Sequence, residues 1–256
     1  ARYHPSKPIQ LFMSTNTIDF SVHHWKDVLE TYPNIQVVQI ENKDYFKNTP
    51  LAKWYESKLW EFSAFEITHM KQYLRMVTLW KGGGQYLDLD VIIFKTLDDN
   101  VFRDFILIGD NRKTIDDSAF HLSRNHPLID KLMTGMLESY ERLEDNFESR
   151  VALKVLKSHC GNPAGTPYVN CTDVQLLPYQ TLPHYHFHSN NWLVPEGANE
   201  KELRHNSKER YGMHRVYNPM MTFVQDIKTD ASFNRLTKKH CPRTVESALL
   251  LSDTAS

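Results

Sequence analysis

Short apolar runs alternate with helically spaced apolar positions along the first part of the chain. Residues 9–13 and 35–40 form such runs and predict two strands, while apolar residues between 22 and 29 have the spacing of one helix face. A strand, a helix and a second strand in this order form the unit of a parallel sheet. The pattern therefore predicts an α/β fold.

The longest continuous pattern spans residues 63–94. Ser63 and Glu66 have the spacing of a capping box, which predicts the start of a helix. The apolar stripe predicted along this helix consists of Ile67, Met70, Leu74 and Val77. The glycines at 82–84 should end it, because glycine readily adopts the positive φ that helix ends favour. The apolar run that follows, residues 86–94, predicts a buried strand.

The rest of the chain predicts further elements of one domain over residues 1–256. Strands are expected at 106–109 and 174–177, and helices at 125–140 and 151–156. The aromatic segment 41–60 is consistent either with a lid over a site or with a long connection. Because the sequence shows no internal repeat and no break in composition, we expect a single α/β domain.

Composition narrows the classes of partner. The formal net charge is −1, so the chain lacks the basic field that nucleic-acid binding requires. No apolar run approaches the roughly 20 residues of a membrane span, and residues 1–7 do not have the pattern of a signal peptide. We therefore expect either a cytosolic protein or one that reaches a membrane only through an anchor outside this sequence.

The cysteines carry a different signal. Cys160 and Cys171 bracket a segment with two glycines and two prolines, which a disulfide would close, and such a bond would indicate a secretory compartment. Asn170 begins a glycosylation sequon, although sequons also occur by chance in cytosolic proteins. Together these features favour a lumenal setting over a cytosolic one.

Two carboxylates, Asp88 and Asp90, interrupt the apolar run of residues 86–94. An unpaired aspartate in a buried strand is costly, and two neighbouring carboxylates repel each other. In an extended segment both would share one face, where a divalent cation such as Mn²⁺ or Mg²⁺ would neutralise them. An alternative stays open, in which arginines or backbone amides neutralise the pair.

Other polar residues are weaker candidates. Arg75 lies on the helix that leads into the aspartates, and we expect it to contact a phosphate or Asp88 unless it is a surface arginine. The histidines at 184, 186 and 188 alternate as in some zinc sites, but a polar strand face or loop is favoured. An Asp-x-Asp pair also occurs in haloacid-dehalogenase phosphatases, where the first aspartate is the nucleophile. There it lies near the first strand, whereas here it follows a long helix.

Residues 74–95 resemble the sequence block of DXD-containing glycosyltransferases. The block reads Leu-Arg, five residues, Lys-Gly-Gly-Gly-Gln-Tyr-Leu-Asp-Leu-Asp-Val, with Lys95 at its last position. Further pieces resemble the α1,4-galactosyltransferase and α1,4-N-acetylglucosaminyltransferase family, and they span roughly residues 1–225. These pieces are Tyr32-Pro-Asn, Thr49-Pro-Leu, Trp54-Tyr, Asn125-His-Pro, Cys160-Gly, Cys171, residues 174–178, Trp192, His214 and Tyr217-Asn218.

The resemblance implies a single GT-A, Rossmann-like nucleotide-sugar transferase domain whose first strand is missing from this sequence. It implies a metal-dependent retaining enzyme that uses a UDP-sugar and Mn²⁺ or Mg²⁺. The enzyme would add galactose, N-acetylgalactosamine or N-acetylglucosamine in α1,4 linkage to a terminal sugar of a glycolipid or glycan. The family also implies the Golgi lumen, glycosphingolipid biosynthesis and a membrane anchor.

The resemblance also implies roles for individual residues. Asp88 and Asp90 would be catalytic, with Asp90 holding the metal, assisted by Asp88 and His214. Donor-binding positions implied by the resemblance are Arg75, Gln72, Tyr86, Asp88 and Asn218. The implied covalent features are a disulfide between Cys160 and Cys171 and a glycan on Asn170.

Some positions depart from the family pattern. Lys71-Gln72 stands where family members carry Ser-Asp, a Trp-Gly…Gly-Pro segment is missing after Phe147, and one extra residue lies between His214 and Tyr217. A second hypothesis therefore remains, in which the chain is a catalytically degenerate paralogue. Such a protein would bind a glycan, a nucleotide-sugar or a partner enzyme.

Overall fold

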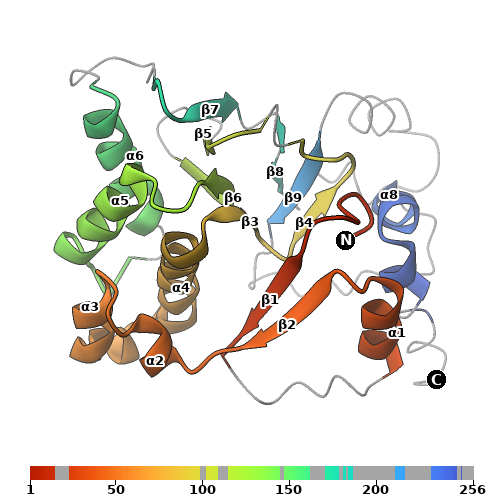
Figure 1. Cartoon of the computed structure of the whole chain (residues 1–256), viewed down its shortest axis with the longest axis horizontal. Coiled ribbons are helices and arrows are strands. Elements are labelled where there is room, and N and C mark those ends of the chain that lie inside the picture. Colours follow the sequence, from red (N-terminus) through yellow and green to blue (C-terminus); the bar gives the residue numbers. More distant parts are fainter. Residues whose placement is uncertain are drawn as a thin grey trace. The chain divides into compact units, whose positions relative to one another are not determined.

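The structure is a computed structural model that describes most of the chain (Figure 1). The described residues are 1–14, 23–98, 102–108, 115–144, 147–161, 171–178, 181–182, 184–186, 211–216, 232–246 and 249. Contacts divide the chain into two compact units. Unit 1 comprises Ala1–Ile40, Leu89–Leu97 and Gln180–Ser256, and unit 2 comprises Glu41–Asp88 and Asp98–Tyr179.

Unit 1 contains the predicted strand–helix–strand unit. Strands β1 (Ile9–Met13) and β2 (Ile35–Gln39) pair in parallel, with helix α1 (His23–Thr31) between them in the chain. A second sheet has the order β4-β9-β8, in which β4 and β9 are antiparallel and β9 and β8 are parallel. Its strands are Val91–Ile93, Gly212–Val216 and His184–His186, and helix α8 spans Ser232–His240.

Unit 2 consists of a mixed sheet and helices. The sheet has the order β3-β6-β5-β7, with β6 antiparallel to β3 and β5, and with β5 parallel to β7. The strands are β3 (Gly84–Leu87), β5 (Phe105–Ile108), β6 (Ile115–Leu122) and β7 (Gln175–Pro178). The helices are α2 (Asn42–Phe46), α3 (Ala52–Ser57), the 3-10 helix η1 (Leu59–Phe62), α4 (Glu66–Gly82), α5 (Pro127–Glu138) and α6 (Phe147–His159). These elements confirm the α/β class, whereas a single domain over residues 1–256 stays a prediction.

The core of unit 2 is aromatic where α3 meets α4. Trp54 stacks on Tyr73 with ring centroids 3.8 Å apart, and both rings are buried. Phe46 and Leu51 are buried beside them, so the segment 41–60 packs into the core and the lid alternative is wrong. The hydroxyl of Tyr73 donates to the carbonyl of Met136, which joins α4 to the predicted apolar face of α5.

Helix α4 differs from its prediction at its start and along its buried face. Ser63 does not cap Glu66: its hydroxyl accepts the N–H of Phe65, and the helix begins without a side-chain cap. Ile67, the first residue of the predicted stripe, is 85% exposed. The buried face instead consists of His69, Gln72, Tyr73, Arg75, Met76, Val77 and Leu79. Polar side chains lie on this face because unit 2 supplies them with partners, so polarity did not mark the solvent side.

The segment with the two aspartates is not one buried strand. Strand β3 ends at Leu87, the backbone turns at Leu89 and Asp90, and β4 begins at Val91 in a different sheet. The side chain of Leu89 is 92% exposed, which excludes a buried strand here. The prediction that both carboxylates share one face of an extended segment is therefore wrong. The turn also carries the boundary between the units, which falls between Asp88 and Leu89.

The glycines after α4 provide a stability test. Gly83 has φ +65°, and a Cβ atom there would lie 2.2 Å from the backbone nitrogen of Arg124. We expect Gly83→Ala to lower the free energy of unfolding by about 2 kcal/mol or more, since both the conformation and the backbone contact oppose a side chain. Urea denaturation of the two proteins measures the difference.

Gly82→Ala is the matched control. Gly82 is the last residue of α4, and no atom lies within 4 Å of a Cβ placed there. Alanine is a better helix former than glycine, so this variant should unfold at the same urea concentration as the parent or a slightly higher one. Equal losses in both variants would contradict the role assigned to Gly83.

Candidate functional site

Asp88 lies at the carboxyl end of β3, in unit 2. Its N–H donates to the carbonyl of Ser118, which extends the β3–β6 pairing by one residue and fixes the backbone. The Lys71 Nζ atom lies 3.3 and 3.4 Å from the two carboxylate oxygens. The side chain of Asp88 is 9% exposed and that of Lys71 is 51% exposed. The mostly buried Asp88 carboxylate is therefore paired with the ammonium group of Lys71, which lies on its solvent side.

Tyr86 orients the same carboxylate. Its hydroxyl donates a hydrogen bond to Oδ1 of Asp88, two residues further along the chain. Burial raises the pKa of Tyr86 far above its usual value, and the neighbouring Asp88 raises it further although Arg75 opposes the shift. The phenol therefore keeps its proton at neutral pH and remains a donor to Asp88.

Arg75 packs against the ring of Tyr86. The arginine is 2% exposed, and its guanidinium carbon lies 4.8 Å from the Tyr86 ring centre and 5.3 Å from that of Phe120. Its Nη atoms donate to the carbonyl and the carboxylate of Asp117, the latter at 3.0 Å. The expected Arg75–Asp88 pair is therefore replaced by an Arg75–Asp117 pair, and the alternative of a surface arginine is wrong as well.

Helix α4 divides its polar residues between the core and the site. Gln72 is 4% exposed and lies on the buried face with Arg75, whereas Lys71 reaches Asp88. Sequence reasoning noted Lys71 only as a departure from the family pattern. The spacing from Lys71 to Arg75 places both cations on one helix face, and this signal was enough to group them.

Asp90 lies on the other side of the turn, in unit 1. It directly precedes β4, whose first residue, Val91, is paired with His214 of β9. The backbone register thus brings the His214 position next to the start of β4, one residue from Asp90. Asn218, a predicted donor-binding residue, and the sequon residue Asn170 lie outside the described residues.

The two aspartates differ in their fitness as metal ligands. Both offer the oxygen donors that Mn²⁺ and Mg²⁺ prefer. Asp88 already forms an ion pair with Lys71 and accepts a hydrogen bond from Tyr86. It is therefore less suited to bind a metal ion. The assignment of a metal ion to Asp90 and His214 stays a prediction.

Comparison with known families identifies the chain. The family described as "Alpha 1,4-glycosyltransferase conserved region" matches residues 121–248. The chain belongs to this family. A second family, "Glycosyltransferase sugar-binding region containing DXD motif", matches residues 2–108, which include the Asp88-Leu89-Asp90 motif. The chain is therefore a glycosyltransferase by family, of the alpha 1,4 class.

Curated relatives support this assignment along nearly the whole chain. Human lactosylceramide 4-alpha-galactosyltransferase is 23% identical over 96% of this chain and 70% of its own length. The mouse enzyme of that name is 23% identical over 95% of this chain and 68% of its own length. Human alpha-1,4-N-acetylglucosaminyltransferase is 22% identical over 95% of this chain and 72% of its own length.

Among solved structures, the chain is similar to PaToxG glycosyltransferase. That similarity has a TM-score of 0.46 and 20% sequence identity, and it covers 61% of this chain and 59% of the other. Within the part of this alpha 1,4-glycosyltransferase that the structure describes, no helix combines the length and the apolar character of a membrane span.

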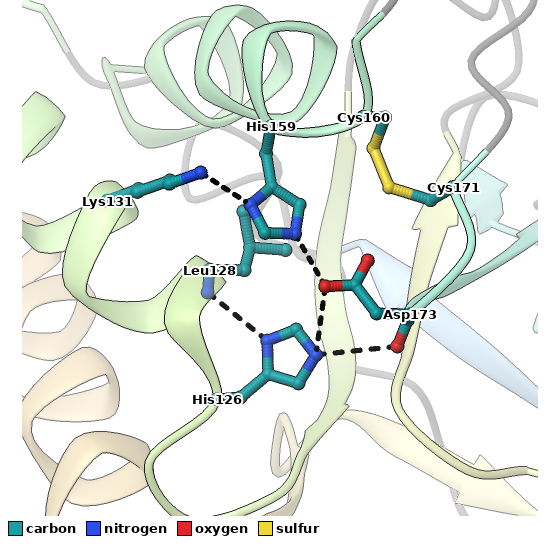
Figure 2. The surroundings of a disulfide bond; sticks show 7 residues. All are labelled: His126, Leu128, Lys131, His159, Cys160, Cys171 and Asp173. Atoms are coloured by element: carbon teal, nitrogen blue, oxygen red, sulfur yellow. Dashed lines mark hydrogen bonds and ion pairs between the residues drawn. A yellow bond between two sulfur atoms is a disulfide. The ribbon is translucent and has the colours of Figure 1, made fainter.

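A second polar cluster of this alpha 1,4-glycosyltransferase lies where α5 begins and α6 ends (Figure 2). His126 caps α5 by accepting the N–H of Leu128 at its Nδ1, 3.2 Å away. Its Nε2 lies 3.8 Å from Oδ2 of Asp173, and Nε2 of His159 lies 2.8 Å from the same oxygen. The Lys131 Nζ lies 3.0 Å from Nδ1 of His159. One carboxylate thus links the ends of two helices.

The disulfide between Cys160 and Cys171 adjoins this cluster (Figure 2). Cys160 directly follows α6, and Cys171 stands two residues before Asp173, so the bond keeps His159 and Asp173 near each other. His159, Cys171 and Asp173 place ligand atoms within 4.8 Å of one another. The sulfur is committed to the disulfide and the other two are paired, so the arrangement is structural rather than a metal centre.

Replacing the buried Arg75 tests how much its contacts near the DXD motif stabilise the fold. We expect Arg75→Met to lower the free energy of unfolding by about 2–3 kcal/mol, because Asp117, Tyr86 and Phe120 lose a shared partner. The loss is smaller than for a fully buried pair because the Asp117 side chain is 32% exposed and is able to hydrate. Urea denaturation measures it. Lys154→Met, which removes an exposed charge from α6, should change stability by less than about 0.5 kcal/mol.

The Asp173 cluster predicts a pH dependence. Partial burial acts to raise the pKa of Asp173, but its hydrogen bond to His159 and the charge of that residue outweigh this effect and lower the pKa overall. A lowered folded pKa gives stability that is present above about pH 4 and is lost as the pH falls below the folded value.

Asp173→Asn should therefore lower the free energy of unfolding at pH 6 by less than about 1 kcal/mol, since 41% of the side chain is exposed. The difference should shrink as the pH falls towards about 2, because the carboxylate of the parent is then increasingly protonated. Urea denaturation at both pH values tests this, with the exposed Asp44→Asn as control. An equal loss at both pH values would show that the carboxylate charge is not the cause.

Proposed function

We propose that this chain is a metal-dependent, retaining hexosyltransferase with a GT-A fold. It moves galactose, N-acetylgalactosamine or N-acetylglucosamine from a UDP-sugar to the 4-position of a terminal sugar on a glycolipid or glycan. The observation that carries the proposal is the DXD motif, whose first carboxylate is held in a fixed orientation by Tyr86 and Lys71. The two family matches, which together cover most of the chain, support the same reaction class.

The relatives support the choice of substrates. Several are named lactosylceramide 4-alpha-galactosyltransferase and one is named alpha-1,4-N-acetylglucosaminyltransferase. Both names describe hexose transfer in α1,4 linkage, and the first names a glycolipid acceptor. The disulfide Cys160–Cys171 agrees with an oxidising compartment. We therefore assign the chain to the Golgi lumen and to glycosphingolipid biosynthesis.

The side chains divide the work of binding the donor. Asp90, assisted by His214, would hold a divalent cation, Mn²⁺ or Mg²⁺. When bound, such a cation supplies positive charge that stabilises the diphosphate of the departing UDP. Asp88 would accept a hydrogen bond from a hydroxyl of the donor sugar or ribose. Asn218 would contact the donor as well.

The buried residues act on the donor indirectly. Tyr86 fixes the Asp88 carboxylate through its hydroxyl, and Arg75 fixes the Tyr86 ring through a cation–π contact. A carboxylate held by two donors loses little freedom when a sugar hydroxyl binds it, so the cost of ordering the site has been met during folding. Gln72 is buried on the same helix and would also help to bind the donor.

A second candidate function has a specific observation in its favour. Lys71 already neutralises Asp88, and Gln72 and Arg75 lie on the buried face of α4 rather than at the surface. A paralogue without transferase activity, which binds a glycan, a nucleotide-sugar or a partner enzyme, would have this arrangement too. Binding and turnover measurements separate the two functions.

Metal and nucleotide binding test the transferase directly. We expect Mn²⁺ and UDP together to raise the thermal unfolding midpoint, because ligands that bind only the folded state stabilise it by mass action. At a ligand concentration about 100 times its Kd the gain is about 2.7 kcal/mol. Asp90→Ala should abolish the gain from Mn²⁺, and Asp88→Asn should mainly weaken the gain from a UDP-sugar. Differential scanning fluorimetry measures all three proteins.

The exposed Asp44→Ala is the matched control and should keep the full gain. Hydrolysis of UDP-galactose, UDP-N-acetylgalactosamine and UDP-N-acetylglucosamine then identifies the donor sugar. A parent protein that gains no stability from Mn²⁺ with UDP and hydrolyses none of the donors contradicts the transferase. Binding to a glycan array under those conditions would favour the second candidate.

A further inference from the structure

Ser118, in strand β6 of unit 2, has a buried side-chain hydroxyl. The residue is fully buried, and its Oγ atom has no hydrogen-bond partner among the residues that the structure describes. The backbone does not need this hydroxyl, because the N–H of Ser118 donates to Oδ1 of Asp116 at 2.9 Å. A buried hydroxyl without a partner is costly, so packing alone would favour alanine at this position. We therefore expect the hydroxyl to find a partner in another state of the protein.

The strand pairing places Asp88 directly opposite Ser118. Leu87 is paired with Ala119 in the antiparallel register, and the next N–H, that of Asp88, donates to the carbonyl of Ser118 at 2.9 Å. Side chains directly opposite each other on antiparallel strands share one face of the sheet, with Cβ atoms about 4.5–5.5 Å apart. A rotation of the serine about χ1 then brings its Oγ within hydrogen-bonding reach of the Asp88 carboxylate.

Two other donors already bind this carboxylate. The Tyr86 hydroxyl donates to Oδ1 of Asp88, and the Lys71 ammonium lies 3.3 and 3.4 Å from the two carboxylate oxygens. The ring of Tyr86 packs against the buried Arg75, whereas the Lys71 side chain is 51% exposed and has a flexible four-carbon stem. Lys71 is therefore the donor that is able to leave Asp88 for a ligand in the solvent.

We propose that Ser118 is a positioning residue that holds Asp88 when Lys71 turns to the diphosphate of the donor. This inference rests on the proposed transferase function, which brings a nucleotide diphosphate to the DXD motif. An ammonium group on the solvent side binds phosphate oxygens as a point charge, and a diphosphate offers it more negative charge than one carboxylate does. The oxygen that Lys71 leaves then accepts the Ser118 O–H. Asp88 thus keeps two donors and its orientation.

A double-mutant cycle tests this exchange without any ligand. Urea denaturation is measured for the parent, Ser118→Ala, Lys71→Met and the variant with both substitutions. In the parent background Ser118→Ala should leave the urea midpoint unchanged, because the hydroxyl that it removes has no partner there. In the Lys71→Met background the same substitution should lower the equilibrium constant for folding about three- to tenfold, as expected for the loss of one hydrogen bond.

Isothermal titration in the presence of Mn²⁺ follows the donor. Ser118→Ala should bind UDP-galactose or UDP-N-acetylglucosamine at least threefold more weakly than the parent, although its urea midpoint is that of the parent. A residue with a purely structural role would not show this combination. Ser139→Ala, which removes an exposed hydroxyl at the end of α5, is the matched control and should equal the parent in both measurements.

UDP alone tests the new partner of Lys71. Lys71→Met should bind UDP more weakly than the parent, because the variant has lost the ammonium that contacts the diphosphate. Lys71→Arg keeps a cation that binds phosphate and should retain most of the affinity. Equal affinity of the parent and Lys71→Met for UDP overturns the exchange of partners.

The stability cycle and the donor titration fail separately. A parent protein that binds none of the donors overturns the proposed transferase and, with it, the role of Ser118 toward the donor. If the parent binds a donor, equal effects of Ser118→Ala in the two backgrounds overturn the role of Ser118 alone, and so does an unchanged donor affinity. A lower urea midpoint of Ser118→Ala in the parent background overturns it as well, since the hydroxyl would then already have a partner.

Discussion

A buried cation between a helix and a sheet is the contact on which the candidate site depends. Arg75 projects from α4 into unit 2 and is held by Asp117 on β6, by the ring of Tyr86 on β3 and by that of Phe120 on β6. A buried guanidinium is tolerated only where carboxylates, carbonyls and aromatic faces surround it. Because those partners come from adjacent strands, the arginine fixes the position of α4 relative to the end of β3.

A chain of contacts connects this arginine to the DXD motif. Arg75 holds Tyr86, Tyr86 holds Asp88, and Lys71, one helical turn before Arg75, covers Asp88 from the solvent side. Each step moves the charge closer to the surface, from a fully buried arginine to a half-exposed lysine. The arrangement gives a carboxylate that is only 9% exposed a cation and a hydroxyl donor from its own unit.

Unit 2 also shows how polar side chains stabilise helix ends. His126 begins α5, His159 ends α6, and both approach one carboxylate oxygen of Asp173, while the disulfide Cys160–Cys171 closes the same corner (Figure 2). These groups resemble metal ligands in type and spacing. However, the histidines and the carboxylate bond to one another, and the cysteines form a disulfide. A cluster of ligand-type residues is therefore evidence for a metal only if its members are not already bonded to each other.

The sequence by itself determined the local elements and the identity of the chemical groups. The β1–α1–β2 unit, the glycine-ended α4, the apolar face of α5 and the DXD motif all follow from short-range spacing. Strand β6 escaped prediction because Asp116 and Asp117 break its apolar pattern, although it lies at the centre of the unit 2 sheet between β3 and β5.

Only the tertiary structure decided which face of α4 is buried and which cation serves which aspartate. Arg75 meets Asp117 across 42 residues of chain and Lys71 meets Asp88 across 17. Periodicity records the polarity of a side chain but not the distant group that will satisfy it. For that reason Arg75 was expected to contact a phosphate or Asp88 rather than Asp117, and the two aspartates were assigned to one straight strand where the chain in fact turns.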